Sequence, residues 1–151
     1  MKSVLTKIFP KSITNEYNGY KIAVYVFMLY SLMSLVRSCI HTFSPDGGAG
    51  SIAHFDLSKG GENIIFAFAL WGSSQLVFAL FQVLVSFKYK SFLPLMYILL
   101  FLEYALRMFI GFTKTSVFEV GAGTPPGGYL DWVMIFLTVV MFVLTVTEKK
   151  M

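Results

Sequence analysis

Four long apolar runs, separated by polar or glycine-rich stretches, dominate the hydropathy pattern of the chain. They cover roughly residues 20–43, 62–87, 92–112 and 129–147. Each holds few charges and is about as long as the roughly 20-residue helix that crosses a hydrocarbon core of about 30 Å. The pattern predicts an all-α integral membrane protein in which residues 1–151 form one domain, an antiparallel four-helix bundle.

The connections between these runs indicate how the spans are arranged. Residues 88–91 read Lys-Tyr-Lys-Ser and are too few for anything but a tight antiparallel hairpin between the second and third spans. Residues 44–61 and 113–128 are long and rich in glycine, and connections of this length are uncommon unless they have a role of their own. An even number of spans separates the two long loops. We therefore expect both on one side of the membrane, as turns or as a lid over the bundle.

The distribution of lysines predicts which side that is. The termini and the short link hold Lys2, Lys7, Lys11, Lys21, Lys88, Lys90, Lys149 and Lys150, whereas the long loops hold only Lys59 and Lys114. Basic residues favour the cytoplasmic side of a membrane protein. We therefore expect both termini in the cytoplasm and both long loops outside.

Composition agrees with a membrane protein and argues against several other classes. Hydrophobic residues make up 56% of the 151 positions and charged residues 13%, about half of what a soluble domain carries. The net charge of +4 comes from lysines at the membrane rim, so we expect no nucleic-acid partner. A single cysteine, Cys39, cannot form an internal disulfide. We expect no cofactor, metal or catalytic set, because His41 and His54 lack ligand spacing and the glycine runs lack a phosphate-loop lysine.

Each span carries polar residues on one helical face, since residues three, four or seven positions apart lie on the same side of a helix. Lipid rejects such groups, so the polar faces are expected to meet inside the bundle. The first span contributes Tyr30, Ser34, Arg37 and His41, the second Trp71, Gln75 and Gln82, the third Glu103 and Arg107, and the fourth Asp131, Thr138 and Thr145. Counting residues along the first three helices places most of these groups in one layer of the membrane.

This layer is the candidate site. Two arginines face one deep carboxylate, Glu103, so the second cation needs another partner: Glu62 or Asp131 at the helix ends, or a bound anion. Our main hypothesis is a non-catalytic protein that binds a small anionic or amphipathic ligand, or a membrane lipid, since guanidinium groups suit oxyanions. The ligand-binding residues in this hypothesis are Arg37, Arg107, Glu103, Gln75, Trp71, Tyr30 and His41.

Other interpretations stay open. Glu103 and Arg107 lie one helical turn apart, and a buried salt bridge between them could simply fix helix packing. The protein could instead be an accessory subunit of a larger membrane complex, or a homo-oligomer, with Gly72 and Ala79 facing the partner. It could also be a membrane enzyme that acts on a lipid or quinone, with Glu103 as the acid–base group. Gly72, Ala79 and Ser86 recur every seven residues, a spacing that also lets a neighbouring helix approach closely.

The first residues of the chain form a segment of their own. Val4, Leu5, Ile8 and Phe9 recur at helical spacing among lysines, and Pro10 follows them. They form either a short helix on the membrane surface, which the proline ends, or a loose basic tail.

Several features that run the length of the chain belong together. They are the four spans, Arg107 in the third span, the loop sequence Ser44-Pro45-Asp46-Gly47-Gly48, and Pro125-Pro126-Gly127-Gly128 before the fourth span. In these features the chain resembles the DoxX-like group of small four-span membrane proteins. The resemblance implies the four-span fold and a bacterial or archaeal plasma membrane, and it assigns no catalytic residue.

Overall fold

The structure is a computed structural model that describes residues 3–114, 116–118 and 126–148. These residues form the short helix α1 (Val4–Ile8), the long helices α2 (Lys21–Phe43), α3 (Gly61–Lys88), α4 (Leu93–Thr113) and α5 (Pro126–Val146), and the 3-10 turn η1 (Lys90–Phe92). Within this described part no β-strand occurs, and one isolated β-bridge pairs Phe55 with Phe118. The predicted all-α class is confirmed.

Four helical stretches are long and apolar enough to cross a membrane: Lys21–Phe43, Gly61–Lys88, Lys90–Thr113 and Gly128–Val146. The four long apolar helices that the sequence predicts are therefore present, with ends that shift by a few residues at most. The largest shift is at α5, which begins at Pro126 rather than near residue 129. Proline is favourable in a first helical turn, because its missing N–H loses no hydrogen bond there.

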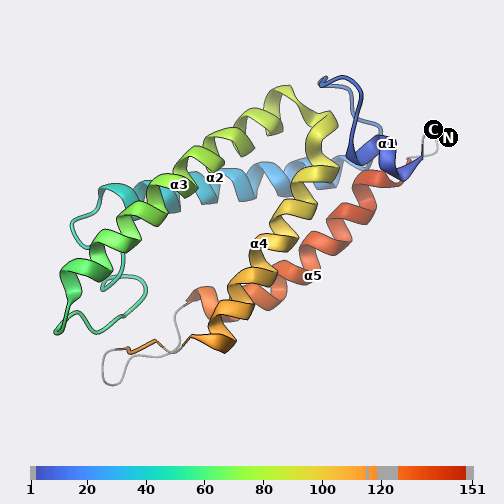
Figure 1. Cartoon of the computed structure of the whole chain (residues 1–151). Helices are drawn as coiled ribbons and strands as arrows, with labels where there is room; N and C mark the ends of the chain where they lie inside the picture. The colour runs from blue at the N-terminus through green and yellow to red at the C-terminus, as the bar shows by residue number, and fades with distance from the viewer. Residues whose placement is uncertain (1–2, 115, 119–125, 149–151) are drawn as a thin grey trace.

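The long helices pack as two antiparallel pairs, α2 with α3 and α4 with α5 (Figure 1). The pairs meet at the terminal end, which we define by η1 and by the last residue of α5, Val146. They spread apart toward the loop end, which we define by residues 44–60 (Figure 1). The bundle is therefore closed at the terminal end and V-shaped toward the loop end.

The apolar core lies toward the terminal end, where all four long helices contribute side chains. Its buried members are Ala23, Val24, Phe27, Val85, Leu93, Met96, Tyr97, Leu100 and Met141. The Tyr97 hydroxyl donates to the Ala23 carbonyl oxygen at 2.6 Å, which ties α4 to the first turn of α2. Lipid tails are as apolar as these side chains, so close packing rather than exclusion of water holds this core together.

α2 and α3 approach each other closely along the small residues predicted to allow it. Gly72, Ala79 and Ser86 are all buried. A Cβ atom added at Gly72 would lie 2.6 Å from the His41 Cβ, and the Ser86 Oγ lies 3.1 Å from the Ser31 Oγ. The small-residue face therefore serves packing within the chain. The accessory-subunit interpretation expected Gly72 to face a partner protein, but Gly72 packs against His41 of the same chain.

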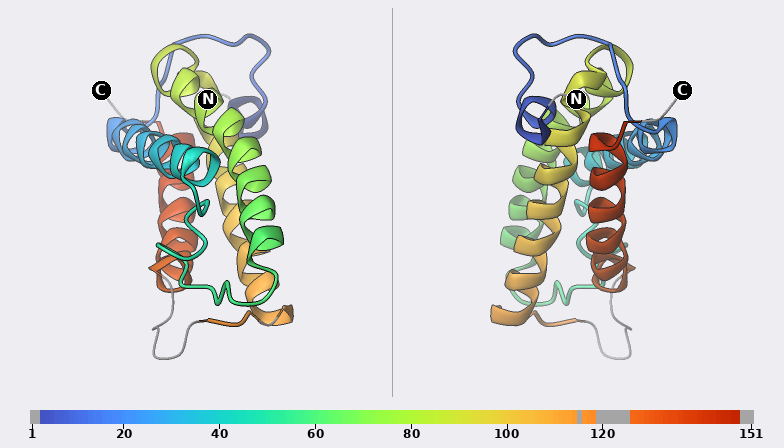
Figure 2. Two further views of the ribbon diagram at one scale, coloured as in Figure 1. Left: turned by 90° about the vertical axis from the view of Figure 1, so that its left-hand side faces the viewer. Right: turned by 90° about the vertical axis from the view of Figure 1, so that its right-hand side faces the viewer.

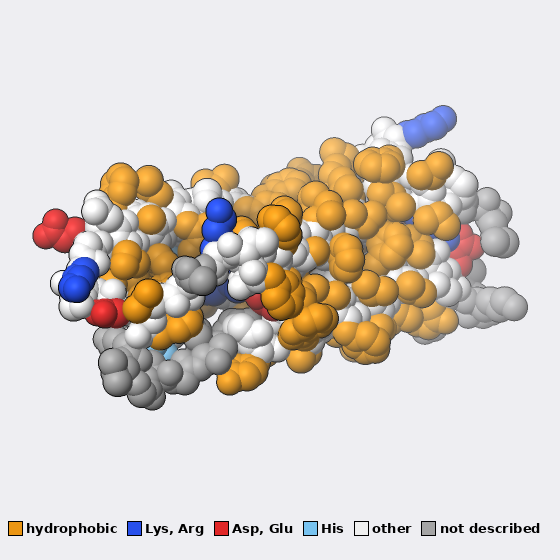
Figure 3. Space-filling view, turned by 60° about the horizontal axis from the view of Figure 1, so that its bottom comes forward, with side chains coloured by type: hydrophobic (Ala, Val, Ile, Leu, Met, Phe, Trp, Pro, Cys, Tyr) orange, Lys and Arg blue, Asp and Glu red, His pale blue; other side chains and the backbone are white. Residues whose placement is uncertain are grey.

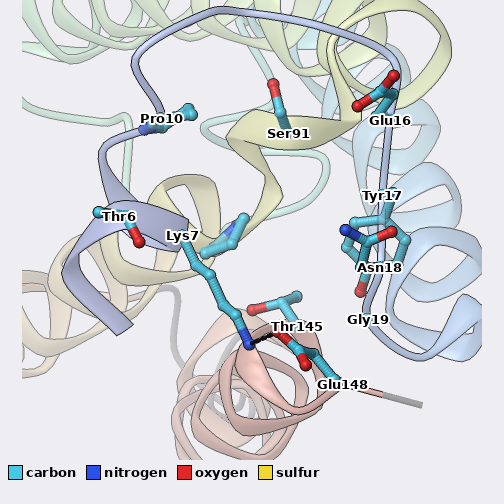
Figure 4. A pocket seen from close by; sticks show the side chains of 11 residues that line it. Thr6, Lys7, Pro10, Glu16, Tyr17, Asn18, Gly19, Ser91, Thr145 and Glu148 are labelled. Atoms are coloured by element: carbon cyan, nitrogen blue, oxygen red, sulfur yellow. Dashed lines mark ion pairs between the residues drawn. The ribbon is translucent and has the colours of Figure 1, made fainter. Parts of the chain in front are cut away.

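The N-terminal segment is a helix tied to the terminal end, not a loose tail. Lys7 Nζ lies 3.0 Å from Glu148 Oε1 and donates to the Val146 carbonyl oxygen at 2.6 Å, beside a small cavity of about 90 Å³ (Figure 4). A lysine at the last carbonyls of a helix is favourable there. The chain then arches over the terminal end (Figure 2), where the Thr14 amide donates to the Ser91 Oγ at 3.0 Å.

The first long loop, residues 44–60, is built around one aspartate. The Asp46 carboxylate accepts hydrogen bonds from the Ser51 amide at 2.7 Å and the Gly48 amide at 2.8 Å. Gly47 and Gly48 have φ angles of 60° and 74°, a left-handed conformation that glycine adopts without a steric cost. The glycine-rich sequence of this loop therefore folds as successive turns. The sequence alone allowed either turns or a lid over the bundle.

The two long loops meet at the loop end. The Asp56 amide donates to the Val117 carbonyl oxygen at 3.2 Å, and the Phe55 and Phe118 rings stack with centroids 5.3 Å apart. Most of the second loop, including residues 119–125, lies outside the described residues. Pro125, one of the residues on which the family resemblance was based, belongs to this stretch.

Hydrophobic side chains cover much of the outer surface, and charged groups are most prominent toward the two ends (Figure 3). Large apolar residues on every long helix are more than half exposed, among them Met33, Phe66, Leu106 and Phe136. Acyl chains of a bilayer would cover such a belt, so exposure of these side chains is what a membrane-spanning bundle requires.

Candidate ligand-binding site

A cavity of about 280 Å³ lies between α2, α4 and α5. It is lined by the polar side chains of Tyr30, Ser34, Arg37, Tyr104, Arg107 and Asp131, and by the apolar side chains of Val26, Leu29, Met33, Leu130, Met134 and Leu137. Arg37 and Arg107 are the lining residues nearest the loop end on α2 and α4, and on α5 Asp131 follows directly after the nearest one, Leu130, whereas Val26 and Leu137 are nearest the terminal end. The cavity therefore has a charged end and an apolar end.

Arg107 pairs across helices rather than along its own helix. Its Nε donates to Asp131 Oδ1 at 3.1 Å, and its Cζ lies 5.6 Å from the centroid of the Tyr104 ring. The sequence also allowed a salt bridge between Arg107 and Glu103 within α4. The structure does not show it, because Arg107 pairs with Asp131 and Glu103 lies near Arg37. Asp131 is within reach because it lies in the first turns of α5, which packs alongside α4.

Arg37 is held more loosely than Arg107. Its Nη2 lies 4.0 Å from Glu103 Oε1, and its Cζ lies 5.5 Å from the centroid of the Trp71 ring. No hydrogen bond from this guanidinium to another described residue accompanies the two contacts. The Arg37 side chain keeps 31% of its surface exposed. Since a guanidinium carries five N–H donors, Arg37 has donors free for a ligand.

The charges of the site balance within the chain. Arg107 has Asp131, and Arg37 has Glu103 at the longer distance. Of the partners that the sequence left open for the second cation, Glu62, Asp131 or a bound anion, the structure selects Asp131. What singles out the site is the loose Arg37 pair beside a cavity, rather than an excess of positive charge.

Two tyrosines form the wall between the charged and apolar ends. The rings of Tyr30 and Tyr104 meet edge to face, with centroids 6.3 Å apart. The Ser34 hydroxyl is buried and forms no hydrogen bond with a described residue, whereas the buried Tyr30 hydroxyl interacts with that of Tyr104. Burying an unpaired hydroxyl costs about 1–3 kcal/mol, so Ser34 favours an occupant that supplies the missing bond.

Three predicted site residues lie behind the cavity rather than along it. Trp71 supports Arg37, and the His41 ring lies 4.9 Å from the Trp71 ring. His41 is buried with its Nδ1 2.7 Å from the Gly47 carbonyl oxygen, so it anchors the first loop to α2 instead of facing a ligand. Gln75 has a buried Oε1 without a hydrogen-bond partner in the described part of the chain and does not line the cavity.

Glu103 contributes through its contact with Arg37 and is not itself a lining residue. Within residues 3–114, 116–118 and 126–148, no three His, Cys, Asp or Glu side chains lie close enough together to hold a metal ion. The cavity lining combines guanidinium and hydroxyl donors with aliphatic side chains.

Sequence reasoning missed Tyr104 and most of the apolar lining. It named Asp131 only as a possible partner for an arginine, although a signal was present. Asp131, Thr138 and Thr145 lie seven residues apart, and the two threonines are buried, so the stripe does mark the inward face of α5. For Met33 and Met134 no signal exists, because apolar residues of a spanning helix look alike whether they face a cavity or lipid.

None of the protein-family models, curated proteins or solved structures compared with the chain matches it. The class rests on the fold: four apolar helices long enough to cross a bilayer define an integral membrane protein.

Proposed function

We propose that this protein binds an amphipathic ligand with an oxyanion head, such as a phosphate or carboxylate, in the cavity between α2, α4 and α5. The proposal rests on one observation. A single cavity of about 280 Å³ has two guanidinium groups at one end and only aliphatic side chains at the other. Ligand sites of this kind are concave and mostly apolar, with a few polar groups that fix orientation.

The arginines have different roles in this proposal. Arg107 is already fixed by Asp131 at 3.1 Å and sets the shape of the charged end. Arg37 has free donors and a carboxylate only at 4.0 Å, so an oxyanion can take up those donors in a two-pronged contact. The Ser34 hydroxyl, which has no partner among the described residues, and the Tyr30 hydroxyl line the same space.

The apolar end favours an amphipath over a simple inorganic anion. Val26, Leu29 and Met33 of α2 face Met134 and Leu137 of α5 across the cavity. A hydrocarbon portion of the ligand would fill this space, where water would find few polar partners. In this proposal the cavity residues bind and orient the ligand and carry out no reaction on it.

A thermal-unfolding experiment in mild non-ionic detergent tests the proposal. Dodecyl phosphate, which has one chain and a phosphate head, is compared with inorganic phosphate, which lacks the chain, and with dodecanol, which lacks the charge. A ligand that binds only the folded state raises the unfolding temperature with concentration. We expect a rise with dodecyl phosphate that exceeds both other additions.

Two variants make the experiment specific. Arg37→Gln is expected to lose the rise, whereas Lys59→Gln, which removes an exposed cation of the first loop outside the cavity, is expected to keep it. Equal shifts in the wild type and in Arg37→Gln would contradict the proposal and favour a purely structural role for the arginines.

A further inference from the structure

The cavity has a neighbour on the lipid-facing side of α2. A second hollow, of about 390 Å³, is lined by Leu32, Met33, Val36, Arg37 and Ile40. Met33 and Arg37 line both this hollow and the cavity. These two side chains are therefore the partition between the interior site and the outer face of α2.

The outer face of α2 at this point belongs to the bilayer. Leu32, Met33 and Val36 are 45–62% exposed and lie in the middle of a spanning helix, where acyl chains surround the protein. A charged side chain is costly at such a position unless it reaches an internal partner or a polar group of lipid. Arg37 reaches inward to Glu103 only at 4.0 Å.

The cavity also opens between α2 and α5. These helices hold together at the terminal end, where the Tyr20 amide donates to the Leu144 carbonyl oxygen at 3.1 Å. From there α2 and α5 run antiparallel along the cavity, and its lining includes Val26, Leu29 and Met33 of α2 and Leu130, Met134 and Leu137 of α5. Leu29, Met33 and Leu130 are each more than half exposed, so the walls continue out to the surface.

A separate hollow lies at the loop end, and among the described residues it does not join the cavity. It is lined by Phe55, Asp56, Lys59, Asn63, Ile64, Ala67, Phe68, Ser116 and Val117, and it shares no residue with the cavity. Between the two lie the side chains that support Arg37 from behind, Trp71 and His41.

We infer that the cavity is filled sideways from the bilayer, past Met33, by a membrane lipid whose phosphate or carboxylate head binds Arg37. One acyl chain of this lipid runs from Arg37 toward the middle of the bilayer, along Val36 and Leu32. This inference rests on the proposed function and deepens it, because it names the source of the ligand. The same head-group chemistry on a water-soluble molecule is the competing source.

Trp71 offers a direct reporter of the site. The chain contains two tryptophans, and Trp132→Phe leaves Trp71, whose ring lies 5.5 Å from the Arg37 Cζ, as the only one. This protein is reconstituted in phosphatidylcholine vesicles with a minor fraction of phosphatidic acid brominated on its acyl chains near the head. Bromine quenches tryptophan fluorescence at short range. Brominated phosphatidylcholine at the same fraction measures quenching by bulk lipid.

The inference predicts severalfold stronger quenching of Trp71 by brominated phosphatidic acid than by brominated phosphatidylcholine. Arg37→Gln removes the difference, and Arg37→Lys, which keeps a charge at a similar place, retains part of it if the fold is intact. Adding millimolar inorganic phosphate does not reverse the quenching. The Trp71→Phe protein, in which exposed Trp132 reports instead, shows equal quenching by the two lipids.

Rates test the route. In this experiment the brominated lipid is transferred from donor vesicles, and the onset of Trp71 quenching is timed. Met33→Phe slows this onset severalfold. Val143→Phe is the control and does not slow it, because Val143 lies on an exposed face of α5 outside the cavity and the hollow. Unchanged rates in Met33→Phe would overturn the lateral route. Equal quenching by both lipids, or reversal by inorganic phosphate, would overturn the lipid source. Dodecyl phosphate stabilisation that depends on Arg37 would still uphold the proposed function in those cases.

Discussion

Arg107 and Asp131 join α4 to α5 through a hydrogen-bonded ion pair with 3.1 Å between Nε and Oδ1, both side chains being at least three-quarters buried. This pair fixes one guanidinium of the cavity, while Arg37, 4.0 Å from Glu103, remains available. The two arginines therefore differ in how firmly they are held, and in the proposed function Arg107 mainly holds the fold together while Arg37 binds the ligand. The predictions below separate these roles.

Asp131→Asn should destabilise the protein by about 2 kcal/mol, because it leaves the largely buried Arg107 charge without its carboxylate partner. Breaking a fully buried ion pair costs about 3–5 kcal/mol. The smaller value is expected here because this pair is partly exposed. Reversible unfolding in mixed detergent micelles measures the change. Glu62→Gln, which removes an exposed acid of α3, serves as the control and should stay close to the wild type. A loss in Asp131→Asn no greater than in this control would show that the pair does not hold α4 to α5.

Arg37→Gln should cost less than about 1 kcal/mol of stability, since its ion pair is long and its side chain is 31% exposed. The same change should abolish ligand binding. Measuring both quantities on one preparation separates a binding residue from a structural one. If Arg37→Gln unfolds the protein in mild detergent, the arginine is structural and the proposed function loses its main residue.

Gly72→Ala should destabilise the α2–α3 pair by about 1–3 kcal/mol, the usual cost of overpacking. Its new Cβ would lie 2.6 Å from the His41 Cβ and 2.8 Å from the His41 carbonyl carbon, so a backbone must move. Gly111→Ala is the matched control, because no atom lies within 4 Å of an added Cβ there and alanine favours the helix. Thermal unfolding of the two variants should shift in opposite directions; equal behaviour would contradict the close approach.

Two backbone hydrogen bonds hold the pKa of the Asp46 carboxyl well below its usual range. The one from the Ser51 amide has the larger effect, and the one from the Gly48 amide adds to it. A lowered folded-state pKa means that the stabilisation is complete above the unfolded value of about 3.9 and is lost progressively as pH falls from there toward the folded-state value. The protection factors of the Ser51 and Gly48 amides, which compare their exchange with that of an unstructured amide at the same pH, should therefore be undiminished at pH 5 and decline below about pH 4. In Asp46→Asn the exchange should be faster at pH 5 and lack this acid step. Protection already lost at pH 5 in the wild type would refute this account of the loop.

The spans could be predicted from the sequence because a membrane imposes one simple requirement, a long apolar helix, on each of them. The close packing of Gly72 was also predictable, since the seven-residue spacing of small residues marks one helical face. The V-shaped spread of the two helix pairs was not, because pairing depends on which helix face meets which neighbour.

Site residues divide in the same way. Arg37, Arg107 and Tyr30 do line one cavity, as their helical spacing suggested, whereas His41 lies behind Trp71 and binds the Gly47 carbonyl oxygen. A polar residue on an inward face can satisfy itself within the protein or face a ligand, and spacing alone does not distinguish these outcomes. The partner of each arginine likewise depends on distances between helices, which the sequence does not contain.

Native mass spectrometry of the protein, extracted gently from its own membrane, tests the central claim most directly. The account predicts a bound small molecule or lipid with an acidic head that is present in the wild type and in Lys59→Gln and missing from Arg37→Gln. A bare protein in all three, equally stable with and without added lipid, would contradict it and leave the arginines a purely structural role. Stoichiometric extra subunits without such a ligand would contradict it as well, in favour of a place in a larger membrane complex.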